Sequence, residues 1–93
     1  MQVLVREISA SPAEFARGLS EAFPAESSGG PLIFQVQAPD ASMEIELVPG
    51  PTRTLASLRL PTLTAHIRFL SGTPTGQHRL LRHMDLAMQR GGG

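Results

Sequence analysis

The sequence predicts an α+β domain in which two helices cover one face of a mainly antiparallel sheet. The chain has 93 residues, of which 41% are hydrophobic and 17% are charged, as in one small globular domain. Two segments repeat their apolar residues with the helical period, and the segments around them are apolar or alternate apolar with polar residues as strands do. We expect a single domain over residues 1–90 and a flexible Gly tail at residues 91–93, with the element order β-α-β-β-β-α.

The first element is predicted to be a strand over residues 2–8. It carries Val3, Leu4, Val5 and Ile8 with few polar residues between them. Such a run is typical of a strand that is buried on both faces.

A capping box predicts where the first helix begins. In Ser11-Pro12-Ala13-Glu14, the Ser11 hydroxyl accepts from a free backbone N–H of the first turn, and the Glu14 carboxylate accepts from the backbone N–H of Ser11. Pro12 takes the first helical position, where no N–H is needed. The helix is expected to end before Pro24, and its apolar arc is formed by Phe15, Ala16, Leu19, Ala22 and Phe23.

A hairpin is predicted after a loop. Residues 25–31 contain two serines and two glycines in a row and are expected to form a flexible surface loop. Two alternating segments then flank a turn at residues 38–41, which predicts an antiparallel hairpin with one face in water. Its inward residues are Leu32, Phe34, Val36, Met43, Ile45 and Leu47, and its outward residues are Gln35, Gln37, Ser42, Glu44 and Glu46.

One long strand, bent at Pro61, is predicted next. Pro49-Gly50-Pro51 is expected to reverse the chain, and an extended run from Thr54 to Leu70 follows. The apolar alternation slips by one residue at Pro61, which a bulge absorbs more easily than a three-residue hairpin. If residues 54–60 pair with the preceding strand, residues 62–70 keep an apolar edge that the first strand or a second subunit must cover.

The last helix is expected to begin at Thr73 and Pro74 and to end near Gln89. Its apolar arc consists of Leu80, Leu81, Met84, Ala87 and Met88. A second arc of about 100° forms a basic stripe around one exposed leucine, and we define this stripe as Arg79, Arg82, His83, Leu86 and Arg90. The inward positions of all the elements predict one core that contains Phe15, Leu19, Phe34, Ile45, Ile67, Leu80 and Met84.

The charges are balanced overall but segregated along the chain. Residues 1–46 hold seven acids and two arginines, a net charge of −5, whereas residues 47–93 hold six arginines and one acid, a net charge of +5. A chain with zero net charge has no overall field that attracts nucleic acid or an anionic membrane. The sequence shows neither a signal peptide nor an apolar run that could span a membrane. Together with a composition rich in Ala, Gly, Pro and Arg, this predicts a bacterial, cytoplasmic protein.

No motif in the sequence predicts chemistry. The chain has no cysteine, and His78 and His83 are five residues apart, about 140° around a helix, so they do not share a face as metal ligands do. His66 is expected at an exposed strand position. Glu44 and Glu46 lie on the same strand face about 7 Å apart, but no apolar wall is predicted beside them that would raise their pKa. We therefore predict no catalytic residue, no metal ligand and no cofactor.

The predicted function is that of a small, non-enzymatic association module, a homodimer or a partner-binding subunit that uses a sheet edge and complementary charges. Its partner is expected to be a second copy or an acidic protein surface, and not a membrane. The candidate surface combines the basic stripe with a layout that is self-complementary under a two-fold axis, Glu44 and Glu46 on one strand and His66 and Arg68 on another. One alternative is binding of nucleic acid or another polyanion by the basic stripe, which is less favoured because the chain has no Lys. A second alternative is an enzyme whose pocket the sequence does not reveal.

Overall fold

The computed structural model describes residues 3–91, with side chains up to residue 88. It confirms the predicted α+β class with two helices and a mainly antiparallel sheet. The elements in chain order are β1 (Val3–Ile8), α1 (Pro12–Ala22), β2 (Ser27–Gly29), β3 (Ile33–Ala38), β4 (Ala41–Pro49), β5 (Arg53–Leu55), β6 (Leu58–Leu60), β7 (Leu63–Gly72) and α2 (Pro74–Gly91).

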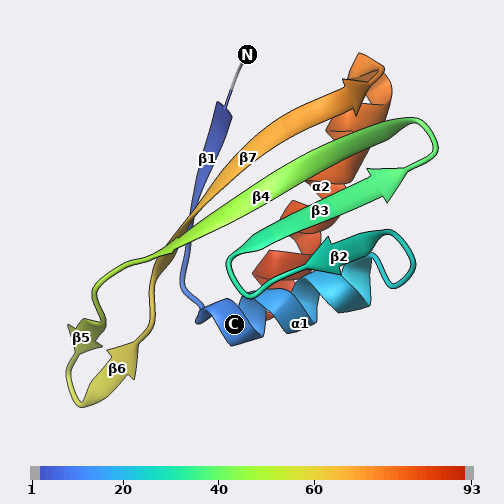
Figure 1. The fold of residues 1–93 in the computed structure, drawn as a ribbon. Coiled ribbons are helices and arrows are strands. Elements are labelled where there is room, and N and C mark those ends of the chain that lie inside the picture. The colour runs from blue at the N-terminus through green and yellow to red at the C-terminus, as the bar shows by residue number, and fades with distance from the viewer. Residues whose placement is uncertain (1–2, 92–93) are drawn as a thin grey trace.

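The main sheet has five strands in the order β1-β7-β4-β3-β2, and all neighbours are antiparallel. Both helices lie on one side of this sheet (Figure 1). The two short strands β5 and β6 form a separate hairpin that projects beyond the ends of β4 and β7 (Figure 1). We call this hairpin, with the residues that join it to the sheet, the arm (residues 50–62).

The core lies between the sheet and the two helices. The predicted core is confirmed, because Phe15, Leu19, Phe34, Ile45, Ile67, Leu80 and Met84 all belong to one buried cluster. The rings of Phe15 and Phe34 join α1 to β3, with their centroids 5.7 Å apart. Burial of this apolar surface is the main force that holds the helices on the sheet.

Both predicted helix starts are confirmed. The backbone N–H of Glu14 donates to Ser11 Oγ over 3.2 Å, and the backbone N–H of Ser11 donates to Glu14 Oε1 over 2.9 Å. Thr73 Oγ1 accepts from the backbone N–H of Gly76 over 3.0 Å, so Thr73 caps α2 as predicted. The prediction that residue 91 starts the tail is wrong, because α2 continues through Gly91, and residues 92–93 of the predicted tail lie outside the described residues.

The prediction that the first strand is buried on both faces is wrong. β1 is an edge strand that pairs only with β7, and the side chains of Val3 and Val5 are 48% and 53% exposed. Leu4 and Ile8 pack against the core from the helix-covered face. The run of apolar residues thus correctly predicted a strand, but it did not show that both faces of this strand are covered.

The predicted flexible loop before the hairpin contains a strand. Ser27–Gly29 forms β2, which pairs with β3 at the second edge of the sheet. Gly29 and Gly30 have φ angles of +98° and +111°, and the backbone N–H of Gly30 donates to the carbonyl oxygen of Ile33 over 2.7 Å. The glycines therefore make the tight turn between β2 and β3, where residues with side chains would be strained.

The single long strand over residues 54–70 is also wrong. The chain does not reverse at Pro49-Gly50-Pro51 but continues through a kink into β5, and it reverses at the turn of Ala56 and Ser57. The backbone N–H of Gly50 donates to the carbonyl oxygen of Thr62 over 2.9 Å, so the two sides of the hairpin stay together through the kink. Pro61 lies in a break between two strands and not in the expected bulge, because β6 ends at Leu60 and β7 begins at Leu63.

The corrected pairing removes the bare edge predicted for residues 62–70. β4 pairs with β7 from Ala41–Gly72 to Pro49–Leu63, and β1 pairs with the other side of β7. The sequence offered two candidates to cover this edge, the first strand and a second subunit, and in the structure the first strand covers it. The two edges of the sheet are instead formed by β1 and β2.

Candidate interaction surface

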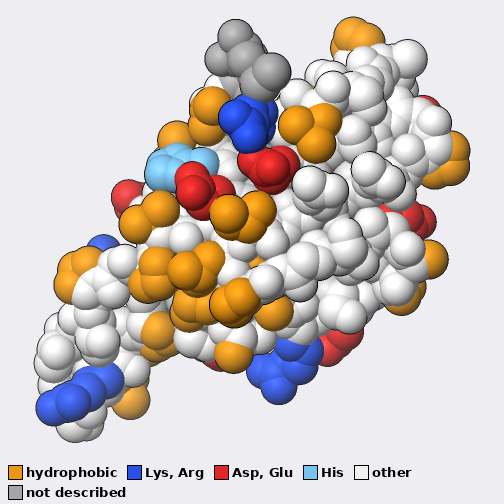
Figure 2. Space-filling model, viewed as in Figure 1, with side chains coloured by type: hydrophobic (Ala, Val, Ile, Leu, Met, Phe, Trp, Pro, Cys, Tyr) orange, Lys and Arg blue, Asp and Glu red, His pale blue; other side chains and the backbone are white. Residues whose placement is uncertain are grey.

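The face of the sheet that the helices leave uncovered carries one group of the predicted site residues. On each strand, the residues next to buried core positions point to this side, which we call the open face. Figure 2 shows this side of the molecule, with acidic, basic and histidine side chains close together and hydrophobic side chains around them. The open face consists of Val3, Val5, Glu7, Ile33, Gln35, Gln37, Glu44, Glu46, Val48, Thr64, His66 and Arg68.

The strand register arranges these side chains in rows across the sheet. One row runs across four strands through Val3, Arg68, Glu44 and Gln35. The next row runs through Val5, His66, Glu46 and Ile33. In a third row, Glu7, Thr64 and Val48 lie side by side. Each of the first two rows thus has an acid and a base in the centre, on β4 and β7, and uncharged side chains at its ends.

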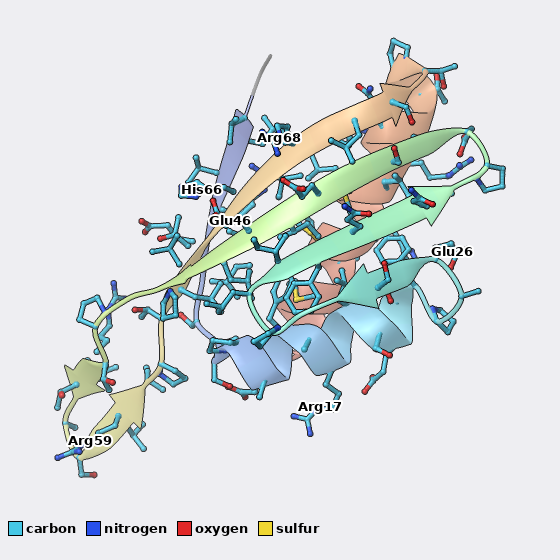
Figure 3. The ribbon with its side chains drawn as sticks, viewed as in Figure 1. Arg17, Glu26, Glu46, Arg59, His66 and Arg68 are labelled. Atoms are coloured by element: carbon cyan, nitrogen blue, oxygen red, sulfur yellow. The ribbon has the colours of Figure 1, made fainter. Side chains whose placement is uncertain are left out.

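The central charges are already paired within the chain. Arg68 forms an ion pair with Glu44, and His66 Nδ1 lies 4.0 Å from Glu46 Oε1. Figure 3 shows Glu46, His66 and Arg68 close to one another over β4 and β7, whereas Arg59 lies at the tip of the arm. The acids and bases of these rows therefore offset each other, and the open face does not carry a strong charge of one sign at its centre.

Aliphatic side chains border the charged centre and are well exposed. Val3 and Val5 lie on β1, Ile33 lies on β3 and is 52% exposed, and Val48 lies on β4 and is 46% exposed. Single exposed aliphatic residues are common on protein surfaces, but several on one flat face are more typical of a contact surface. The sequence alone missed this, because Val3 and Val5 were taken for core residues.

The basic stripe on α2 is divided between different contacts. Arg79 forms an ion pair with Asp40 in the β3–β4 turn. His83 Nε2 lies 2.8 Å from the carbonyl oxygen of Ala22, and its ring meets the Phe23 ring edge-on with a centroid distance of 4.9 Å. Leu86 is 47% exposed, as predicted. The side chain of Arg90 lies outside the described residues.

The acidic side chains on α1 and the basic stripe meet within one chain. Glu14 and Glu21 line the same surface groove as His83 and Leu86, between α1 and α2. A second copy or an acidic protein surface was the partner expected for the basic stripe. The proximity of these acids to the stripe within the monomer means that no second copy is needed to bring them together.

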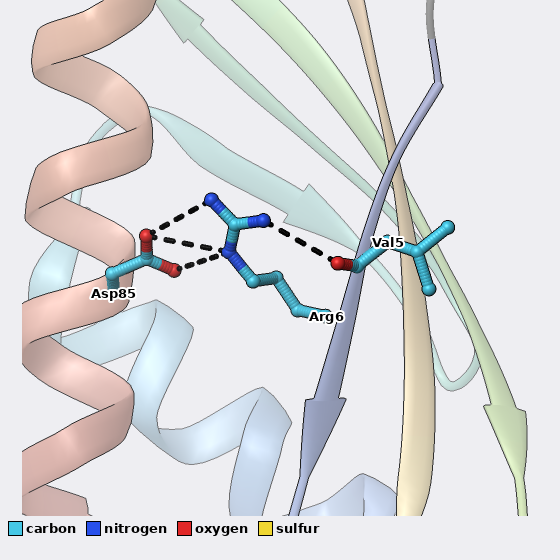
Figure 4. A network of polar contacts seen from close by, with 3 residues as sticks. All are labelled: Val5, Arg6 and Asp85. Carbon is cyan, nitrogen blue, oxygen red and sulfur yellow. Dashed lines mark hydrogen bonds and ion pairs between the residues drawn. The ribbon is translucent and has the colours of Figure 1, made fainter.

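The ion pairs also explain the charge segregation along the chain. Each of the four ion pairs found among the described side chains joins the acidic first half to the basic second half. Arg6, one of two arginines in the first half, contacts Asp85, the single acid of the second half, with Nε and Oδ1 3.3 Å apart (Figure 4). Arg6 also donates to the carbonyl oxygen of Val5 over 3.3 Å, within β1. The Arg6–Asp85 pair is the contact that connects β1 to α2 (Figure 4).

Other polar groups do not converge on a site for chemistry. A hollow at the base of the arm is lined by Glu7, Ser9, Arg53, Thr62 and Thr64 among others. Within residues 3–91, no three His, Asp or Glu residues lie together as metal ligands would, and none of the buried side-chain nitrogen or oxygen atoms lacks a hydrogen-bond partner. Neither helix in the described part of the chain has the length and hydropathy that a membrane-spanning segment requires. We assign no catalytic role to these residues.

Comparison with known proteins adds no family to this description. No protein-family model matches the chain, and a search of curated proteins found no significant match.

Proposed function

We propose that this protein is a small association module and that its open face packs against a second copy of the chain. The observation that supports this proposal is the row layout, in which acids on β4 lie beside bases on β7 with exposed aliphatic residues around them. A surface that carries both halves of a complementary pattern fits a copy of itself, as two-fold homodimers require.

The size and shape of the open face support the same partner. The four strands have six to ten residues each and are spaced about 4.8 Å apart, so they cover on the order of 500 Å². This is below the ~800 Å² per partner of a standard interface, so we expect a weak dimer that forms in a concentration-dependent way. A β-sandwich of two such sheets would bury the exposed valines and isoleucine between them.

The charges favour a second copy over a partner of one sign. An acidic or a basic partner would meet repulsion from half of the central groups, whereas a copy of the chain offers an acid for each base. Polyanion binding by the basic stripe has less support, because the chain has no Lys.

Sedimentation equilibrium tests the proposal. We expect the wild type to dimerise reversibly between about 1 μM and 1 mM. Ile33→Asp and Val5→Asp should each shift the protein toward monomer, because they place an unpaired carboxylate in the contact. Leu86→Asp is the matched control, since Leu86 is 47% exposed but lies on α2, away from the open face.

Circular dichroism should show that all three variants are folded, because none of these side chains belongs to the core. A wild type that stays monomeric over this range would reject the proposal. Dissociation by Leu86→Asp alone would transfer the interface to the basic stripe.

A further inference from the structure

The rows on the open face also determine how two copies would be oriented, and this inference rests on the proposed function. Two identical faces that pack against each other are related by a two-fold axis that lies in the plane between them. The two packings that keep the strands of both sheets aligned have this axis either along the strands or across them. The two choices place different strands opposite each other, so the charges discriminate between them.

An axis across the strands places each strand opposite the same strand of the partner. Glu44 and Glu46 of β4 would then face the partner's β4, and His66 and Arg68 would face the partner's β7. Like charges would meet over the centre of the interface. Apposition of like charges disfavours an interface.

An axis along the strands, between β4 and β7, places each of these two strands opposite the other. Glu44 then faces the partner's Arg68, and Glu46 faces the partner's His66, because these residues share a row in the register. The exposed ends of the second row match as well, since Val5 faces the partner's Ile33. Every central acid thus meets a base, and one apolar border meets the other.

We infer that two copies of this chain associate around a two-fold axis that runs parallel to the strands between β4 and β7. Packed sheets are usually rotated by about 30° against each other, so the contacts closest to the axis keep their register best. Those contacts are the four pairs formed by Glu44, Glu46, His66 and Arg68 with their counterparts, and the two that involve His66 are ion pairs only when its imidazole is protonated. They would link each acid to one base in its own chain and to one in the partner.

Cross-linking tests this orientation directly, because the chain has no cysteine of its own. Within one chain, Val5 and Ile33 are three strand spacings apart, about 14 Å. Facing sheets lie about 10 Å apart, too far for a direct disulfide, so we would use a short bis-maleimide reagent. Val5→Cys/Ile33→Cys should give a covalent dimer, whereas Val5→Cys alone should not.

A covalent dimer from Val5→Cys alone would support the axis across the strands and overturn our inference. A wild type that dimerises while the double-cysteine variant fails to cross-link would also overturn it, although the proposed function would stand. A wild type that remains monomeric would reject both. The three results are thus distinguishable in one set of samples.

Charge complementation provides an independent check. Glu44→Arg/Glu46→Arg and His66→Glu/Arg68→Glu make the centre of the open face all basic and all acidic, respectively. Each variant alone should associate at least about tenfold more weakly than the wild type, and an equimolar mixture should recover the association as a heterodimer. A mixture that associates no better than its components would overturn the inferred orientation.

Discussion

Glu14 shows how one side chain can serve folding through its charge. The backbone N–H and the hydroxyl of Ser11 both interact with its carboxylate, and together they lower the pKa of Glu14 below the usual 4.5. A group whose pKa is lower in the folded state stabilises the fold above its unfolded pKa and loses that contribution as the pH falls. The capping box should therefore weaken in acid.

We predict that Glu14→Gln lowers the stability at pH 7 and that the difference from the wild type shrinks as the pH falls through 4.5. Urea unfolding at several pH values measures this difference. Glu21→Gln, on the same helix but outside the capping box, is the control. A Glu14→Gln effect that stays constant down to pH 3 would show that the charge of Glu14 does not contribute.

Phe34 tests which side chains of the β3–β4 hairpin point into the core. It is 5% exposed, and its ring packs against Phe15 across the core. Phe34→Ala should lower the free energy of unfolding by about 3–5 kcal/mol, because it removes a buried ring and leaves a cavity. A loss below about 1 kcal/mol in urea unfolding would contradict the position of this ring in the core.

At the scale of the elements, local signals in the sequence were sufficient for both helices and for the β3–β4 hairpin. The capping box at Ser11 depends only on neighbouring residues and is confirmed. The predicted alternation of the hairpin holds except at its ends, because Leu32, expected to point inward, is 39% exposed and Ser42, expected to point outward, is 8% exposed beside a register shift. The arm was not predicted, because the one-residue shift in the apolar alternation at Pro61 is compatible both with a bulge and with a break between two strands. Pro49-Gly50-Pro51 is likewise compatible with a turn or with a kink, and only the pairing of β4 with β7 decides between them.

The arm should contribute little to stability, in contrast to the strands from which it extends. Leu58 is 59% exposed at its tip, whereas Leu63, at the start of β7, is 2% exposed. We expect Leu58→Ser to change the free energy of unfolding by less than about 0.5 kcal/mol and Leu63→Ala to lower it by about 2–5 kcal/mol. Similar losses for both variants would indicate that the arm packs against the domain.

At the scale of the whole molecule, folding pairs part of the segregated charge, because three of the seven acids of the first half contact bases of the second half. Asp40, Glu44 and Glu46 in the first half pair with Arg79, Arg68 and His66 in the second. A sequence read without contacts shows two oppositely charged halves and suggests a partner for each. In the folded chain the two halves are partners of each other.

The same comparison shows how far the candidate surface was predictable. Glu44, Glu46, His66 and Arg68 were placed correctly, because strand alternation assigns a face without knowledge of the fold. The apolar border of this surface was not predicted, since β1 gives no local sign that it is an edge strand. Arg79 and His83 were expected on the basic stripe, but their contacts within the chain come from segments 39 and 61 residues away in the sequence.

Whether two copies meet through the open face is measured by a dilution series followed by two-dimensional ¹H–¹⁵N NMR. On dilution from about 1 mM to about 20 μM, we expect the amide signals of Val5, Ile33, Glu46 and His66 to shift together toward the monomer positions. The signals of Arg17 on α1 and Arg82 on α2 should stay in place. Concentration-dependent shifts confined to the helices, or none at all, would contradict a contact through the open face.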